Sequence, residues 1–123
     1  MKNLSINKLP NVILESLGLW DTTGVLKMSA ASDLASSVVN EKRNSNTIDI
    51  HVTSIDEYFK GITGKLAFVK MNIEGAEIAA LNGAKNFIKN NKVDLSVCTD
   101  HYVNGELTYG PVEKIFSGWG MPC

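Results

Sequence analysis

Cysteine is scarce in this chain of 123 residues, with Cys98 inside an apolar run and Cys123 at the last position. Two cysteines placed in this way exclude a disulfide framework, and a reducing environment is the simpler expectation. The first eight residues carry positive charge without an apolar run behind it, which argues against a signal peptide. No apolar stretch is long enough to span a bilayer. A soluble, cytoplasmic protein with no membrane partner is therefore expected.

An excess of charge of one sign is also lacking. Twelve lysines and arginines face thirteen aspartates and glutamates, which gives a net charge of −1. This balance excludes the basic surface typical of nucleic-acid binding and an electrostatic membrane anchor. No nucleic-acid partner is expected, and the length suits one domain with a single core.

The pattern that is present is a strand, a helix and a second strand. Residues 66–71 form the longest apolar run, which predicts a strand buried on both faces of a parallel sheet. Residues 76–90 place apolar side chains at spacings of three and four, as in an amphipathic helix. Residues 93–98 alternate apolar and polar side chains, as in a strand. The short links between them predict a βαβ unit with a right-handed crossover.

Further elements are expected on both sides of this unit. Ser54 and Glu57 have the spacing of a capping box, which predicts a short helix through Phe59. Pro111 suits the first position of a helix and Gly118 its end. The remaining expectations are strands over residues 11–14, 25–28 and 48–52, a polar loop over 29–46 and a helix over 112–117.

Polar residues follow three of the predicted strands. They are G-L-W-D at residues 18–21, N-I-E-G at residues 72–75 and T-D-H at residues 99–101. Ligands of doubly wound sheets bind beyond the carboxyl ends of the strands. We therefore expect a binding site where these segments meet.

The same segments carry a resemblance to a known family. The run F-V-K-M-N-I-E-G-A-E at residues 68–77, followed by L-N-G-A at residues 81–84, resembles the signature of the FkbM methyltransferases. Residues 11–24 are similar to the third-strand region of that family, and residues 52–58 resemble the segment before the signature. The resemblance implies an α/β fold, namely part of a Rossmann-like, doubly wound, mostly parallel sheet of the class I methyltransferase type. Residues 1–123 would form one partial domain, whose ends look cut.

The resemblance also implies a function and its residues. The reaction would be S-adenosylmethionine-dependent O-methylation of a sugar or another small hydroxylated metabolite. The catalytic candidates are Asn72, Glu74 and His101. The cofactor-binding candidates are Gly18, Leu19 and Trp20, close to the adenine. No metal site is expected, because no recognisable ligand spacing is present.

A second interpretation is a truncated or degenerate chain without catalysis, acting as a binding or interaction module or being a gene fragment. No G-x-G turn follows any predicted strand, and Asn72 stands where the family usually has Asp. An amide cannot act as a base or as a charged ligand. A missing first strand would expose a sheet edge and favour self-association. Asn72 also suits a helix N-cap, His101 a loop position and Trp20 a core position.

Overall fold

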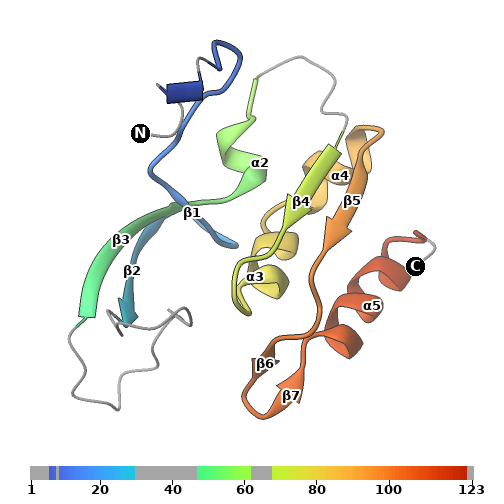
Figure 1. Ribbon diagram of the computed structural model, residues 1–123. Helices are drawn as coiled ribbons and strands as arrows, with labels where there is room; N and C mark the ends of the chain where they lie inside the picture. The colour runs from blue at the N-terminus through green and yellow to red at the C-terminus, as the bar shows by residue number, and fades with distance from the viewer. Residues whose placement is uncertain (1–5, 8, 30–46, 62–67, 122–123) are drawn as a thin grey trace.

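The computed structural model describes residues 6–7, 9–29, 47–61 and 68–121 (Figure 1). The predicted polar loop lies outside these residues, except for Ser29 at the end of a strand. Within the described parts, no helix has the length and apolar character needed to cross a membrane.

A three-stranded sheet forms one side of the molecule. Its central strand β3 (Thr47–Thr53) pairs in parallel with β1 (Gly18–Leu19) and antiparallel with β2 (Gly24–Ser29). The strands predicted over residues 25–28 and 48–52 are confirmed. The strand predicted over residues 11–14 is wrong, because this segment is a loop followed by the two-residue β1. Its apolar side chains remain exposed, Ile13 at 84%, so little burial of apolar surface supports a strand here.

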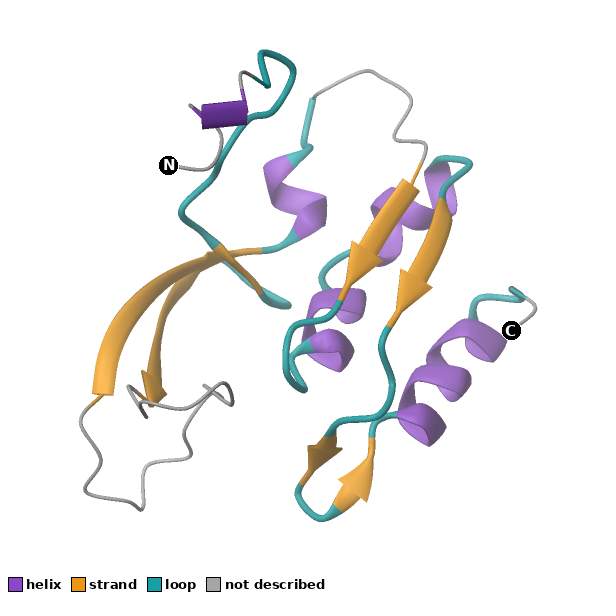
Figure 2. Ribbon diagram, in the orientation of Figure 1, coloured by secondary structure: helices purple, strands orange, loops and turns teal. Residues whose placement is uncertain are grey.

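The predicted βαβ unit forms the other side. Strands β4 (Phe68–Met71) and β5 (Asp94–Val97) pair in parallel, and α3 (Glu77–Asn82) and α4 (Lys85–Asn90) connect them (Figure 1). The expected burial of β4 on both faces is wrong, since Phe68 is 57% exposed and Lys70 is also exposed. Figure 2 shows α3 and α4 on one face of this sheet. Apolar side chains of both strands pack toward the core on that face, whereas Phe68 and Lys70 point away from it.

The predicted single helix over residues 76–90 is interrupted at Gly83. A Cβ atom at this buried position would collide with the carbonyl oxygen of Trp20 and lie 2.8 Å from the Cβ of Ser54. The missing side chain thus lets the two sides of the molecule approach each other closely at this point. Helix α3 ends at this residue, whose carbonyl oxygen accepts a hydrogen bond from the Asp56 amide at 2.8 Å, and α4 begins at Lys85 as a separate helix.

The short helix with Ser54 as its N-cap is confirmed, and this helix also contacts α4. The Ser54 hydroxyl accepts a hydrogen bond from the Glu57 amide at 3.1 Å at the start of α2 (Ile55–Tyr58). The Asp56 carboxylate accepts hydrogen bonds from the amides of Asn86 at 3.1 Å and Phe87 at 2.7 Å. It thereby caps α4, whose own N-cap residue Ala84 has no side-chain cap. One short helix thus joins both sides of the molecule.

The C-terminal part contains a hairpin that the sequence reasoning missed. Strands β6 (Tyr102–Val103) and β7 (Glu106–Leu107) pair antiparallel around Asn104 and Gly105, which have φ values of 53° and 85°. Asn-Gly is the dipeptide most typical of such a two-residue turn, so the signal was present. Helix α5 (Tyr109–Gly118) follows and is longer than predicted, with Pro111 as its third residue rather than its first.

The fold is mixed α/β, as expected. Helices α3, α4 and α5 surround a core of buried apolar residues, namely Ile55, Met71, Ala80, Leu81, Ala84, Ile88 and Val112. Strands of the described residues form a three-stranded sheet, a two-stranded sheet and a hairpin. A single doubly wound Rossmann-like sheet is thus not confirmed among them, and the longest pairing, between β2 and β3, is antiparallel.

Replacement of Gly83 by alanine tests the close approach of the two sides. We expect Gly83→Ala to lower the free energy of unfolding by about 1–3 kcal/mol, because backbone or side chains must move to admit the methyl group. Urea denaturation measures this change. Gly118→Ala in α5 is the matched control, since no described atom outside its own helix lies within 4 Å of its added Cβ. Equal effects of the two replacements would contradict the packing argument.

Candidate functional site

A fully buried carboxylate organises the loop after β4. Glu77, the first residue of α3, has no exposed surface. Its Oε1 accepts a hydrogen bond from the Ile73 amide at 2.7 Å, and its Oε2 accepts one from the Gly75 amide at 2.9 Å. Backbone amides arranged in this way form an anion-binding cradle, which a side chain of the same chain fills here. The loop is therefore folded around Glu77.

The cradle requires unusual backbone at two consecutive residues. Glu74 has a φ of 56° and Gly75 a φ of 96°. A Cβ at Gly75 would lie 2.9 Å from Cγ2 of Val103, so the hairpin packs directly on this glycine. The left-handed conformation is unfavourable for Glu74 and is sustained by the surrounding contacts. As a result, the Glu74 side chain is held at the carboxyl end of β4.

His101 lies between the carboxylates of Glu77 and Glu74. Its Nδ1 is 3.2 Å from Oε1 of Glu77, and its Nε2 is 3.6 Å from Oε2 of Glu74. The imidazole is largely buried, with 17% of the side chain exposed. The structure therefore brings together two of the three predicted catalytic residues, Glu74 and His101, at the ends of β4 and β5.

Two further polar groups lie beside His101. The Cys98 thiol donates a hydrogen bond of 2.8 Å to Oδ1 of Asp100, and this oxygen is 3.9 Å from Nε2 of His101. The hydrogen bond to Asp100 raises the pKa of the Cys98 thiol, because the carboxylate favours the protonated form. The same bond lowers the pKa of Asp100. At neutral pH these directions favour a thiol next to an ionised carboxylate.

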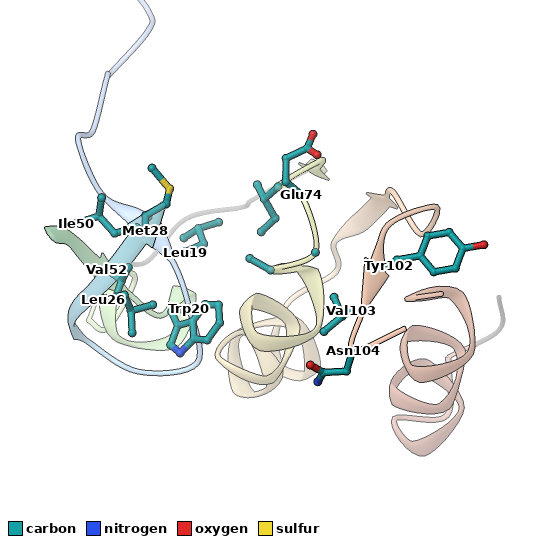
Figure 3. Close-up of a pocket in the computed structure, with 14 residues that line it drawn as sticks. Leu19, Trp20, Leu26, Met28, Ile50, Val52, Glu74, Tyr102, Val103 and Asn104 are labelled. Carbon is teal, nitrogen blue, oxygen red and sulfur yellow. The ribbon is translucent and has the colours of Figure 1, made fainter. Parts of the chain in front are cut away.

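A cavity of about 450 Å³ lies between the three-stranded sheet and the loop after β4. Gly18, Leu19 and Trp20, the predicted cofactor-binding residues, line it together with Glu74. Figure 3 shows Leu19, Trp20 and the apolar side chains of β2 and β3 on one side, with Glu74 and the hairpin residues on the other. The remaining lining residues are Leu26, Met28, Ile50, Val52, Ile73, Gly75, Ala76, Tyr102, Val103 and Asn104.

Asn72 differs from its predicted place. Its side chain is exposed, and it is not one of the residues that line the cavity. The alternative role as a helix cap is also wrong, because Ala76 is the N-cap residue of α3 and makes no side-chain cap bond. Among the described residues, no hydrogen bond or ion pair joins Asn72 to Glu74 or His101.

The burial of Glu77 and the hairpin at this site were not predicted from the sequence. Glu77 near a helix start is favourable in any protein, so its position alone did not reveal that it is buried. The contribution of Tyr102, Val103 and Asn104 follows from the Asn-Gly turn, which could have been recognised. The arrangement offers a mostly apolar cavity with titratable groups at one edge.

Comparisons with known proteins give one match. The family model described as the methyltransferase FkbM domain matches residues 2–118, which is nearly the whole chain. Searches of curated proteins and of solved structures found no match.

Replacement of Glu77 by glutamine tests the cradle. We expect Glu77→Gln to lower the free energy of unfolding by about 1–3 kcal/mol, since its amide NH₂ cannot accept one of the two backbone hydrogen bonds. Urea denaturation measures the loss. Glu113→Gln, at an exposed position of α5, is the control and should change stability by less than about 0.5 kcal/mol. A Glu77→Gln chain as stable as this control would show that the cradle is dispensable.

Proposed function

Because the chain belongs to the FkbM methyltransferase family, we propose that it transfers a methyl group from S-adenosylmethionine to a hydroxyl oxygen of a sugar or another small metabolite. The observation that carries this proposal is the cavity that joins Gly18, Leu19 and Trp20 to Glu74. Its position at the carboxyl ends of β1 and β4 is typical of ligand sites in α/β proteins. In this proposal the fold derives from the Rossmann-like sheet of class I methyltransferases.

The cavity suits the adenosine part of the cofactor. Its volume of about 450 Å³ lies within the range of small-molecule sites, and most of its walls are apolar. The amide of Trp20 donates to the carbonyl oxygen of Thr53 at 3.0 Å, which fixes the backbone next to the cavity. Gly18 lets β1 pack closely on β3, because an added Cβ would lie 3.0 Å from Val52 Cγ1. Trp20 would contact the adenine ring by stacking.

Glu74 and His101 supply the proton chemistry of the proposed reaction. When bound, S-adenosylmethionine supplies a methyl carbon activated by the sulfonium. An oxygen–carbon bond forms to the acceptor while the carbon–sulfur bond breaks, and the acceptor hydroxyl must lose its proton. Glu74 lines the cavity and accepts this proton, and the His101 imidazole lies 3.6 Å from the Glu74 carboxylate. Positioning of the two reactants in the cavity contributes the rest.

A chain that binds but does not catalyse is the second candidate. Two observations favour it. Asn72 is exposed and lies outside the cavity lining, and none of the described strands is followed by a G-x-G turn. Such a turn brings backbone close to a cofactor in related folds. Cofactor binding without turnover would support this candidate.

Calorimetric titration with S-adenosylmethionine and S-adenosylhomocysteine tests the cofactor site. We expect saturable binding by the folded chain and a dissociation constant about tenfold or more higher in Trp20→Ala, through loss of stacking on the adenine. Trp119→Ala is the control, since Trp119 packs edge-on against Phe116 and does not line the cavity. Absence of binding by a chain with intact circular dichroism would overturn the proposal.

Glu74→Gln tests the catalytic step. With methyl-labelled cofactor and a panel of hydroxylated sugars, we expect kcat to fall by about 10²- to 10⁴-fold while cofactor affinity is retained. Glu57→Gln, on the exposed surface of α2, should leave both unchanged. If Glu74→Gln turned over like the parent chain, another group would have to accept the proton.

A further inference from the structure

Three side chains at the carboxyl end of β5 bring metal-binding atoms together. Cys98, Asp100 and His101 each offer one ligand atom, and these atoms lie within 4.8 Å of one another. The Cys98 sulfur is 2.8 Å from Oδ1 of Asp100, which is 3.9 Å from Nε2 of His101. Ligand atoms around a tetrahedral zinc ion are about 3.3–3.7 Å apart, given the usual metal–ligand distances. Small side-chain rotations would therefore bring these atoms to a common ion.

Glu77 makes His101 a prepared ligand. The buried Oε1 of Glu77 lies 3.2 Å from Nδ1 of His101, but the angle is not that of a hydrogen bond, and Nδ1 has no other hydrogen-bond partner among the described residues. A small rotation of the ring would turn Nδ1–H toward this carboxylate and leave Nε2 to bind a metal. Histidines that bind metals usually have a carboxylate or carbonyl at the other ring nitrogen. Glu77 is itself held by the amides of Ile73 and Gly75, so the carboxylate behind the imidazole has a fixed position. A buried carboxylate behind the histidine, here that of Glu77, is typical of metal sites and is not expected in a chance grouping of polar residues.

The backbone around the ligands is also fixed. The amide of Cys98 donates to the carbonyl oxygen of Met71 at 2.9 Å and so continues the pairing of β4 with β5. The carbonyl oxygen of His101 accepts from the amide of Thr108 at 2.9 Å, where the hairpin returns to the start of α5. The ligands thus lie between two anchored points, and the 81% exposed Asp100 side chain leaves a path for an ion from solvent.

We propose that Cys98, Asp100 and His101 bind a divalent zinc-like cation, with Glu77 as the positioning carboxylate behind His101. A thiolate, an imidazole and a carboxylate are ligands suited to Zn²⁺ or Co²⁺ and poorly suited to Mg²⁺ or Ca²⁺. Three protein ligands leave one coordination position open, next to Glu74 at the edge of the cavity. Binding of the ion needs neither cofactor nor methyl transfer, so the proposal goes beyond the function proposed above.

Titration of the metal-free chain with Co²⁺ tests this site. We expect a thiolate-to-cobalt charge-transfer band together with the visible bands of a tetrahedral ion, and Zn²⁺ should displace both. An excess of Mg²⁺ or Ca²⁺ should displace neither. Because no S-adenosylmethionine is present, a failure here is distinct from a failure of cofactor binding. A folded chain that gives no such bands and binds no Zn²⁺ in calorimetry would overturn the proposal.

The sequence offers a matched control for each key ligand, because it contains two cysteines and two histidines. Cys98→Ser should abolish the charge-transfer band, and Cys123→Ser should leave it. His101→Gln should weaken Zn²⁺ binding at least tenfold, whereas His51→Gln, at an exposed position of β3, should not. Glu77→Gln should weaken it by about 10- to 100-fold while keeping the thiolate band, as expected for a group behind the ligand. Loss of the band in Cys123→Ser instead of Cys98→Ser would assign the ion to another site.

Discussion

The buried carboxylate of Glu77 is the contact on which the candidate site depends. A carboxyl group without exposed surface is unfavourable unless hydrogen bonds compensate it, and two backbone amides do so here. Those amides belong to the loop that holds Glu74 in a left-handed conformation. The same carboxylate faces His101, which follows a different strand. The Glu77 side chain thus contacts residues that follow both β4 and β5. Val103 of the hairpin packs directly against Gly75 in the loop after β4.

The cavity depends on a different contact, between the two sides of the molecule. The three-stranded sheet contributes the apolar wall, and the loop after β4 contributes the polar edge. Gly83 sets how closely the backbone at Trp20 approaches the helices, and Asp56 links α2 to α4. The geometry of the proposed adenine contact is therefore set by residues that do not line the cavity. Substitutions of Gly83 or Asp56 would therefore change ligand binding by shifting the cavity walls, not by removing contacts to the ligand.

Elements determined by local chemistry were predictable from the sequence. Alternation identified β3, and the Ser54 capping box identified α2. Predictions failed where contacts between segments distant in the sequence determine the secondary structure. Residues 11–14 have an apolar pattern but remain exposed and form no strand. The helix over residues 76–90 is divided at Gly83, against which backbone near Trp20 packs closely. The site was predicted in part, since Gly18, Leu19, Trp20, Glu74 and His101 lie around one region, whereas the burial of Glu77 requires knowledge of the tertiary structure.

The cap that Asp56 provides for α4 spans about thirty residues of sequence, with Asn86 and Phe87 as its donors. These two amides lack the intrahelical acceptors available to later residues of the helix, so their protection from hydrogen exchange derives from another part of the chain. Their exchange rates therefore report the docking of the two sides, separately from the integrity of α4 itself. Comparison of Phe87 with Ile88, whose amide donates to Ala84 within the helix region at 2.9 Å, would distinguish a transient separation of the sides from local fraying. In this way the protein carries an internal probe of the motion that would open its cavity.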